Sequence, residues 1–346
     1  MSDAIRVGLV GFGYASKTFH APLIGGTPGM ALKAVASSDA DKVHADWPGV
    51  KVMSAPGDLL DDPDIDLVVI ATPNDTHFPL AKAALEAGKH VVVDKPFTVT
   101  LSQARELESL AKHCGRILSV FHNRRWDSDF LTVSALINEG QLGEVCYFES
   151  HFDRFRPQVR QRWREQAGPG SGIWYDLAPH LLDQVVVLFG LPVSITVDLA
   201  QLRPGAQSTD YFHAVLAYPQ RRVVLHGTLL AAAESARFIV HGSRASYIKY
   251  GLDPQEERLK NGERLPQEDW GYDMRDGTLT RAEGDERSQE KWLTLPGNYP
   301  AYYAAIRDAI NGVGENPVPA SEAIQIMTLI ELGIESARHR ATLSLV

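Results

Sequence analysis

Lys95 occupies a position from which an amine could act on a bound ligand. It follows the apolar run at residues 91–93, which predicts a strand buried on both faces, and Pro96 ends that strand. In a parallel sheet, the carboxyl ends of the strands open onto the ligand crevice. A lysine is rarely placed beside a core without a partner or a task, although a snorkelling side chain is the alternative.

Asp176 and His180 form a second candidate pair. They are four residues apart, so on a helix they share one face. Pro179 between them is tolerated only in the first helical turn, which places both residues at a helix N-terminus. The helix dipole there disfavours an imidazolium ion, and a general base requires a neutral imidazole. The alternative is a buried structural histidine with Asp176 as the helix N-cap.

A glycine-rich turn near the start of the chain predicts a dinucleotide site. The sequence GFGYAS follows an apolar strand at 5–10 and precedes a helical segment. Gly11 permits the tight turn, Gly13 lets the backbone approach a pyrophosphate, and Ser16 is small enough for helix–strand packing. A glycine turn in another α/β fold is the alternative. The predicted site also includes the other residues of the turn, Phe12 and Tyr14.

The end of the second predicted strand favours NADP over NAD. Sites for NAD usually carry an acidic residue here, which binds the ribose 2′-hydroxyl. Ser37 occupies that position by the register of the strand, and Ser38 and Lys42 follow it. Two hydroxyls and an ammonium group suit a 2′-phosphate, with helix amides helping. Asp39 is the argument for NAD, but we interpret it as the N-cap of the next helix.

Strands and helices alternate through the first 122 residues, which predicts a parallel, doubly wound sheet. The expected strands span 5–10, 32–36, 50–53, 67–71, 90–93 and 117–121, and the clearest helices span 76–87 and 101–114. Polar residues after the fourth strand lie where the nicotinamide half of a cofactor should rest. They are Thr72, Pro73, Asn74 and His77. Plain helix capping by residues 74–76 is the alternative.

The pattern changes after residue 122. Successive strand signals without intervening helices predict an antiparallel sheet, with strands at 144–155, 193–202, 211–218, 222–230 and 236–250. The expected helices span 129–139, 174–189, 299–311 and 321–339. Residues 253–291 are polar and rich in Gly, Glu and Asp, and we expect a surface excursion there without assigned structure.

The composition argues against several classes of protein. The 346 residues carry 34 basic and 43 acidic side chains, a net charge of −9, which is unfavourable for nucleic-acid binding. No apolar run approaches the roughly 18 residues of a membrane span, and the N-terminus shows no signal-peptide pattern. Cys114 and Cys146 stand apart without C-x-x-C spacing, which predicts a reducing, cytoplasmic setting and no metal site.

Four motifs together resemble the Gfo/Idh/MocA family of oxidoreductases. They are GFGYASKTFH, ATPNDTH, VVVDKPF and the glycine-rich run at 170–180, which ends in D-x-x-x-H. The resemblance covers essentially the whole chain. It implies an α/β fold with a Rossmann domain at 1–122, followed at 123–346 by a domain for substrate binding and oligomerisation with a large, mostly antiparallel, open-faced sheet. The family usually has Glu-Lys-Pro, whereas this chain has Asp94 before Lys95, which leaves the role of Asp94 open.

The segments DKPF and FHNRRWDSDF resemble a subgroup that contains NADP-dependent scyllo-inositol dehydrogenases. The resemblance implies hydride transfer between a secondary alcohol of a cyclic polyol or sugar and NADP, with NAD as the alternative. Lys95, Asp176 and His180 would form the catalytic set, in which His180 takes the hydroxyl proton and Lys95 stabilises charge on the same oxygen. The resemblance also implies a homodimer or homotetramer assembled through the C-terminal sheet. Asp94 and Lys95 would join the cofactor site, and the substrate contacts would be Lys95, Asn123, Arg124, Trp126, Tyr175, Asp176 and His180.

Several alternatives remain open from the sequence. The protein could reduce a non-sugar substrate, or act as a non-catalytic NADP(H) sensor. Surface salt bridges are an alternative role for Arg124 and Arg125. The five arginines of residues 154–164 could form a phosphate or nucleic-acid patch, a solvated strand edge or subunit contact, or a contact with an anionic part of substrate or cofactor. The acidic balance of the chain favours the strand edge or subunit contact.

Overall fold

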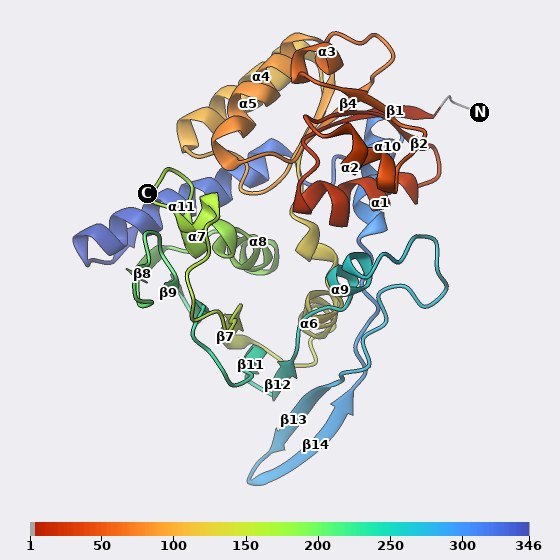
Figure 1. Ribbon diagram of the computed structural model, residues 1–346. Helices are drawn as coiled ribbons and strands as arrows, with labels where there is room; N and C mark the ends of the chain where they lie inside the picture. The colour runs from red at the N-terminus through yellow and green to blue at the C-terminus, as the bar shows by residue number, and fades with distance from the viewer. Residues whose placement is uncertain (1–3, 346) are drawn as a thin grey trace. The chain divides into compact units, whose positions relative to one another are not determined.

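The computed structural model describes residues 4–345, which form two compact units (Figure 1). The first unit extends to Asn123 and also includes Gln255–Trp270 and Asn298–Ile324, whereas the second comprises the remaining segments. The predicted boundary at residue 122 lies beside the first break. The two later segments group with the first unit because the chain returns to it: the carbonyl of Val318 accepts hydrogen bonds from the Val120 N–H and the Ser119 hydroxyl.

The first unit is built on a parallel sheet in the strand order β3-β2-β1-β4-β5-β6. The central strands β4 and β5 consist of buried apolar residues after His90, as expected for strands covered on both faces. The strand order reverses between β1 and β4, which is where doubly wound sheets bind dinucleotides. The predicted Rossmann fold is therefore confirmed. Its strands are β1 (Ile5–Val10), β2 (Met30–Ala36), β3 (Lys51–Met53), β4 (Leu67–Ile70), β5 (His90–Val93) and β6 (Leu118–Val120).

Helices lie on both faces of this sheet. Helices α4 and α5 pack together on one face, and α1 packs with α10 on the other (Figure 1). The helices of the first unit are the π-helix η1 (Ser16–His20), α1 (Ala21–Gly25), α2 (Ala40–Asp46), α3 (Pro56–Leu60), the 3-10 helix η2 (Asn74–Thr76), α4 (His77–Glu86), α5 (Leu101–Cys114), α9 (Gln255–Lys260) and α10 (Pro300–Ile310).

The second unit contains a sheet in the order β14-β13-β12-β11-β7-β10-β9-β8-β15. Strands β7 and β10 pair in parallel and the other described pairings are antiparallel, so the predicted mostly antiparallel sheet is confirmed. The strands are β7 (Val145–His151), β8 (Ser194–Ala200), β9 (Tyr211–Tyr218), β10 (Arg221–Thr228), β11 (Ala236–Gly242), β12 (Ala245–Tyr250), β13 (Gly277–Glu283), β14 (Glu286–Trp292) and β15 (Leu343–Ser344).

Helix α8 packs on one face of this sheet, where Phe189 meets Phe148 with ring centroids 5.5 Å apart. The opposite face carries half-exposed side chains, among them Glu149, His151 and His213. The helices of this unit are α6 (Ser128–Asn138), the 3-10 helix η4 (Trp163–Glu165), α7 (Gly172–Asp176), α8 (Ala178–Phe189) and the later part of α11 (Ala320–His339). No helix within residues 4–345 is both long and apolar enough to cross a membrane.

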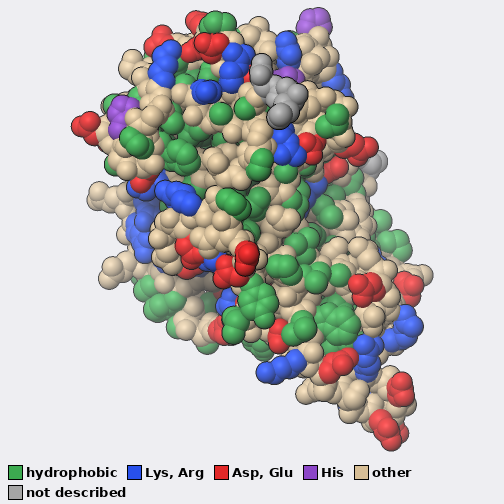
Figure 2. All heavy atoms as spheres, turned by 90° about the vertical axis from the view of Figure 1, so that its right-hand side faces the viewer, with side chains coloured by type: hydrophobic (Ala, Val, Ile, Leu, Met, Phe, Trp, Pro, Cys, Tyr) green, Lys and Arg blue, Asp and Glu red, His purple; other side chains and the backbone are tan. Residues whose placement is uncertain are grey.

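The hairpin β13–β14 occupies much of the polar segment 253–291, which was expected to be a surface excursion and was given no assigned structure. Its outer strand, Glu286–Trp292, is almost entirely exposed and polar, so it has no hydrophobic alternation to mark it. The strand is defined instead by its pairing with β13 and by the turn at Gly284, where φ is +58°. Figure 2 shows charged side chains at its lower tip, where this hairpin ends.

Candidate active site

The register of the first unit's sheet aligns the carboxyl ends of its strands. Val10 pairs with both Ala36 and Ile70, Ile70 pairs with Val93, and Val93 pairs with Val120. The loops that follow these strands therefore leave the sheet at one edge. They carry most of the residues that the sequence analysis assigned to the cofactor, including Gly11, Ser37, Thr72 and Lys95.

The glycine-rich turn has the geometry that a pyrophosphate requires. Gly11 has φ +87°, and a Cβ there would lie 3.0 Å from the carbonyl oxygen of Ala71, so only glycine fits without strain. A Cβ at Gly13 would meet nothing within 4 Å, which leaves its backbone accessible to a ligand. The Ser16 hydroxyl donates to the Gly11 carbonyl at 2.8 Å and fixes the turn. The turn thus fits a dinucleotide phosphate at a helix start.

The two aromatic residues of the turn have different surroundings. Phe12 is buried in the core of the unit, whereas Tyr14 is 52% exposed. The Tyr14 hydroxyl donates to Glu256 at 2.6 Å, which joins the turn to helix α9. A side-chain contact with the cofactor is therefore open to Tyr14, while Phe12 can offer only its backbone. Their cofactor roles stay predictions.

The end of β2 has the polar character expected for a 2′-phosphate site. Asp39 caps helix α2, since its carboxylate accepts the backbone N–H of Lys42 at 3.0 Å. The Ser37 hydroxyl accepts the Asp39 N–H at 3.2 Å, while Ser38 and the Lys42 side chain are exposed. The predicted N-cap is therefore present. The carboxylate that could favour NAD is already engaged by the helix start.

His77 ties two of these loops together. Its ring nitrogens lie 2.9 Å from the carbonyl oxygen of Pro96 and 3.0 Å from that of Thr72. Burial lowers the pKa of His77, and its hydrogen bonds to the backbone carbonyls oppose that shift. Asn74 is also buried, and Pro73 is exposed beside it. This geometry gives His77 a positioning function, and direct contact with the cofactor stays a prediction.

Asp94 anchors the backbone before Lys95. It is buried, and its carboxylate accepts the Lys95 N–H at 2.8 Å, with Nε2 of His20 at 4.0 Å. Nδ1 of His20 lies 2.6 Å from the Tyr303 hydroxyl, and burial lowers the pKa of His20 to about 4. The roles of His20 and Tyr303 in this arrangement were not predicted from the sequence. His20 stands within the GFGYASKTFH motif, but no sequence signal links it to a tyrosine 283 positions away.

His180 lies in the first turn of α8, and Asp176 is the last residue of α7. The helix predicted at 174–189 divides at Leu177, because Pro179 has no N–H to continue the ladder from α7. The shared helical face predicted for Asp176 and His180 is therefore corrected to two adjoining helices. Pro179 does lie in the first turn, as predicted, and His180 is buried there.

Arginine and aromatic side chains surround His180 within the second unit. Its ring stacks near Phe152, with centroids 6.4 Å apart. The guanidinium groups of Arg124 and Arg154 lie over the Phe152 ring at 4.8 and 4.9 Å. Arg124 is buried and pairs with Asp127 at 3.1 Å. His180 thus stands beside a cationic, partly aromatic wall.

The other predicted substrate residues have varied surroundings. Tyr175 is half-buried, and burial raises its pKa to about 12, so its phenol stays protonated and can donate a hydrogen bond. Trp126 is half-buried and Asn123 is buried, at the two ends of the 3-10 helix η3 (Asn123–Trp126). Arg125 donates to both carboxylate oxygens of the buried Asp183, at 2.6 and 2.8 Å, which is a structural ion pair below the surface.

A histidine–carboxylate group on β7 and β10 was not foreseen. Asp153 lies 3.0 Å from Nδ1 of His151 and 2.9 Å from Nδ1 of His226, and Glu149 lies 2.6 Å from Nε2 of His151. The ligand atoms of His151, Asp153 and His226 lie within 4.8 Å of one another, close enough for one metal ion. The hydrogen bonds already satisfy these groups without an ion. Glu149, His151 and Asp153 alternate along one stretch of the chain, but His226 lies 73 positions beyond Asp153, and no sequence signal joins it to them.

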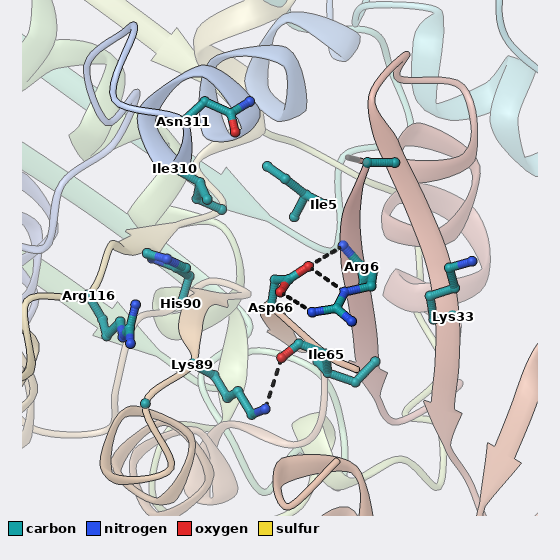
Figure 3. A pocket seen from close by; sticks show the side chains of 12 residues that line it. Ile5, Arg6, Lys33, Ile65, Asp66, Lys89, His90, Arg116, Ile310 and Asn311 are labelled. Atoms are coloured by element: carbon teal, nitrogen blue, oxygen red, sulfur yellow. Dashed lines mark hydrogen bonds and ion pairs between the residues drawn. The ribbon is translucent and has the colours of Figure 1, made fainter. Parts of the chain in front are cut away.

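A cavity of about 720 Å³ lies at the other edge of the first unit's sheet (Figure 3). Its walls include Ile5, Asp66 and His90, near the amino ends of β1, β4 and β5. Figure 3 shows the Arg6 guanidinium bridging to Asp66, and Lys89 donating to the Ile65 carbonyl. Ligands of doubly wound sheets bind at the carboxyl ends, so this cavity is not part of the candidate active site.

Two family models match the chain. One, described as an oxidoreductase family with an NAD-binding Rossmann fold, matches residues 5–122, and the other, described as the C-terminal alpha/beta domain of an oxidoreductase family, matches residues 134–345. A solved structure of a Yersinia pestis protein is 68% identical in sequence and superposes with a TM-score of 0.97, covering 100% of this chain and 98% of that one.

Two curated proteins are similar in sequence to this chain over nearly its full length. YdgJ of Escherichia coli K12, an uncharacterized oxidoreductase, is 81% identical over 345 residues, covering 100% of both chains. IolW of Bacillus subtilis 168, a scyllo-inositol 2-dehydrogenase (NADP(+)), is 36% identical over 345 residues, covering 99% of this chain and 96% of IolW.

Proposed function

Because this chain belongs to the Gfo/Idh/MocA oxidoreductase family, we propose that it transfers a hydride between a secondary alcohol of a cyclic polyol or sugar and NADP(H). The observation that carries this proposal is the open turn at Gly13, together with Ser37, Ser38 and Lys42, which follow strand β2. Residues 1–122 would bind the cofactor and residues 123–346 the substrate. The 36% identity to IolW supports an inositol-like substrate.

The preference for NADP rests on charge at the end of β2. A 2′-phosphate carries negative charge and needs hydrogen-bond donors, which Ser37, Ser38 and Lys42 can supply. A carboxylate at the position of Ser37 would repel that phosphate. The nearby carboxylate of Asp39 caps helix α2 instead. NAD remains usable because a ribose hydroxyl can bind the same serines.

The reaction needs a base and a group that stabilises developing charge on the substrate oxygen. The bound nicotinamide supplies the hydride chemistry. His180 would take the proton of the reacting hydroxyl, since a helix start favours its neutral form. Lys95 would donate to the same oxygen as it becomes a carbonyl.

Neighbouring groups would hold these residues and the substrate in position. The carboxylate of Asp94 fixes the backbone at Lys95. The Asp176 carboxylate would bind His180 or a substrate hydroxyl, and the protonated Tyr175 phenol would donate to another hydroxyl. Asn123, Arg124 and Trp126 would line the same pocket.

We further propose a homodimer or homotetramer formed through the sheet of the second unit. The face opposite α8 carries half-exposed aromatic and histidine side chains, which suit a protein partner better than bulk water. Sedimentation velocity at several protein concentrations would test the assembly, and a species that stays monomeric throughout would contradict it.

Both cysteines are free thiols, which supports a cytoplasmic location.

The activity is tested by adding NADP+ or NAD+ with a panel of inositols and sugars and following nicotinamide absorbance. We expect reduction of NADP+ with a higher kcat/KM than reduction of NAD+. Tight binding of NADPH without turnover of any alcohol would instead favour a sensor. Turnover with a clear preference for NAD+ would refute the cofactor assignment while leaving the dehydrogenase proposal standing.

A further inference from the structure

The segment 154–164, called here the arginine segment, concentrates positive charge on an acidic protein. The whole chain has a net charge of −9, yet this segment has no acidic residue. Its cations are Arg154, Arg156, Arg160, Arg162 and Arg164. A group of like charges repels itself unless an anion offsets it.

The start of the arginine segment is fixed to the second unit rather than trailing in solvent. The N–H groups of Arg154 and Arg156 donate to the carbonyls of Thr228 and Leu229 at 2.9 and 2.7 Å. The buried side chain of Arg203 donates to the carbonyls of Arg156 and Gln158, at 3.0 and 3.2 Å.

Arg203 itself is locked by ion pairs with Asp210 at 2.9 Å and Glu165 at 3.2 Å. These bonds fix the backbone at residues 154–158 before any ligand arrives, which lowers the entropy lost when a ligand binds.

The guanidinium of Arg156 is in an environment that disfavours its positive charge. Burial lowers its pKa first, and repulsion from Arg154, Arg160 and Arg162 lowers it further. The nearby charge that acts in the other direction belongs to Asp176. Within the described residues, the Arg156 guanidinium takes part in no ion pair. A half-buried guanidinium among other guanidiniums is stabilised when an oxyanion binds.

The arginine segment also adjoins the proposed catalytic residues of its own unit. The guanidinium of Arg154 lies over Phe152, whose ring stacks near His180. Nε of Arg164 lies 3.6 Å from the Asp176 carboxylate. An anion on these arginines would therefore lie close to the base that takes the hydroxyl proton.

We propose that the substrate carries an oxyanion, a carboxylate or a phosphate, in addition to the reacting alcohol, and that Arg156 with its arginine neighbours binds it. This inference rests on the proposed function and narrows its substrate class from neutral polyols to acidic or phosphorylated ones. Arginine suits both groups, because its planar fork donates two parallel hydrogen bonds to a carboxylate or a phosphate.

The test compares matched neutral and anionic substrates. With saturating NADP+, kcat/KM is measured for glucose, glucuronate and glucose 6-phosphate, and for myo-inositol and an inositol monophosphate. We expect the anionic members to exceed their neutral partners by at least roughly tenfold, the value of one charge-assisted hydrogen bond. The carboxylate and phosphate arms show which oxyanion is used. Raising the salt concentration should raise KM for the anionic members.

Arg156→Gln is the informative variant. It should reduce the anionic-to-neutral ratio of kcat/KM by roughly 10- to 150-fold. Arg287→Gln is the matched control, since Arg287 is exposed on the β13–β14 hairpin, and it should leave that ratio unchanged. An unchanged KM for NADP+ in Arg156→Gln distinguishes a substrate site from a cofactor-phosphate site, and an increased one would refute the substrate assignment.

Equilibrium binding separates failure of this inference from failure of the proposed function. The same compounds are titrated into the NADP+ complex by calorimetry. Anion binding that Arg156→Gln abolishes, without turnover of any compound, would refute the dehydrogenase and support the anion site. Neutral compounds that bind and react as well as anionic ones, or an equal loss for both classes in Arg156→Gln, would overturn the inference.

Discussion

Replacing Gly11 or Gly13 by alanine should have very different effects on the free energy of unfolding. Gly11→Ala forces an alanine to φ +87° with its Cβ 3.0 Å from the Ala71 carbonyl oxygen. The left-handed backbone costs about 1–2 kcal/mol, and the close contact adds about 1–3 kcal/mol. Gly13→Ala meets no atom within 4 Å and has no positive φ, so the free energy of unfolding should change by less than about 0.5 kcal/mol.

Cofactor binding should show a different pattern, because Gly13→Ala should weaken NADPH binding while leaving the free energy of unfolding nearly unchanged. The methyl of Gly13→Ala would occupy the space from which backbone meets the pyrophosphate, and losing one charge-assisted hydrogen bond weakens NADPH binding roughly 10- to 150-fold. Urea unfolding gives the stabilities, and fluorescence titration gives the affinities. A Gly13→Ala protein that binds NADPH like wild type would refute the assigned pyrophosphate site.

The remaining predictions concern cofactor choice and pH dependence. Ser37→Asp should weaken NADP+ binding by at least roughly tenfold and spare NAD+, because a carboxylate repels the 2′-phosphate; Ser102→Asp, which adds the same charge on α5, is the control, and equal effects on both cofactors would contradict the site. Burial opposes ionisation of Asp153, but hydrogen bonds from His151 and His226 outweigh it and lower its pKa. The stability that Asp153 contributes is therefore present above its unfolded pKa and lost as pH falls below about 4. Burial likewise opposes charging of His151, but Asp153 and Glu149 outweigh it and raise its pKa, so that contribution is lost as pH rises above about 6.5. Asp153→Asn should cost about 1–3 kcal/mol near pH 6 by urea unfolding, with the difference from wild type shrinking at both extremes, and a pH-independent difference would contradict the network.

The alternation of apolar strands with capped helices was enough to predict the first unit's sheet and the edge where its polar loops gather. The signals were local: Gly11 and Gly13 follow a strand directly, and Lys95 ends one. Pro179 was correctly placed in the first turn of a helix, because proline is tolerated there, although that helix was expected to begin at residue 174.

Features that depend on distant partners could not be predicted. The return of residues 298–324 to the first unit depends on Val318 bonding beside β6, and no local pattern marks that pairing. The same holds for the contact between His20 and Tyr303. Strand β14 was missed because its side chains face solvent, so pairing alone defines it. The anchoring of the arginine segment by Arg203 joins parts of the chain more than 40 residues apart.

The proposal that Lys95 acts in hydride transfer is tested most directly by the Lys95→Ala variant. Turnover of NADP+ with the best alcohol of the panel should fall roughly 100- to 10,000-fold, the value of a proton-handling or charge-stabilising group. Affinity for NADPH should fall by no more than roughly tenfold. Lys33→Ala, which removes an exposed lysine from β2, is the control and should match wild type. Wild-type turnover in Lys95→Ala would contradict the proposed mechanism.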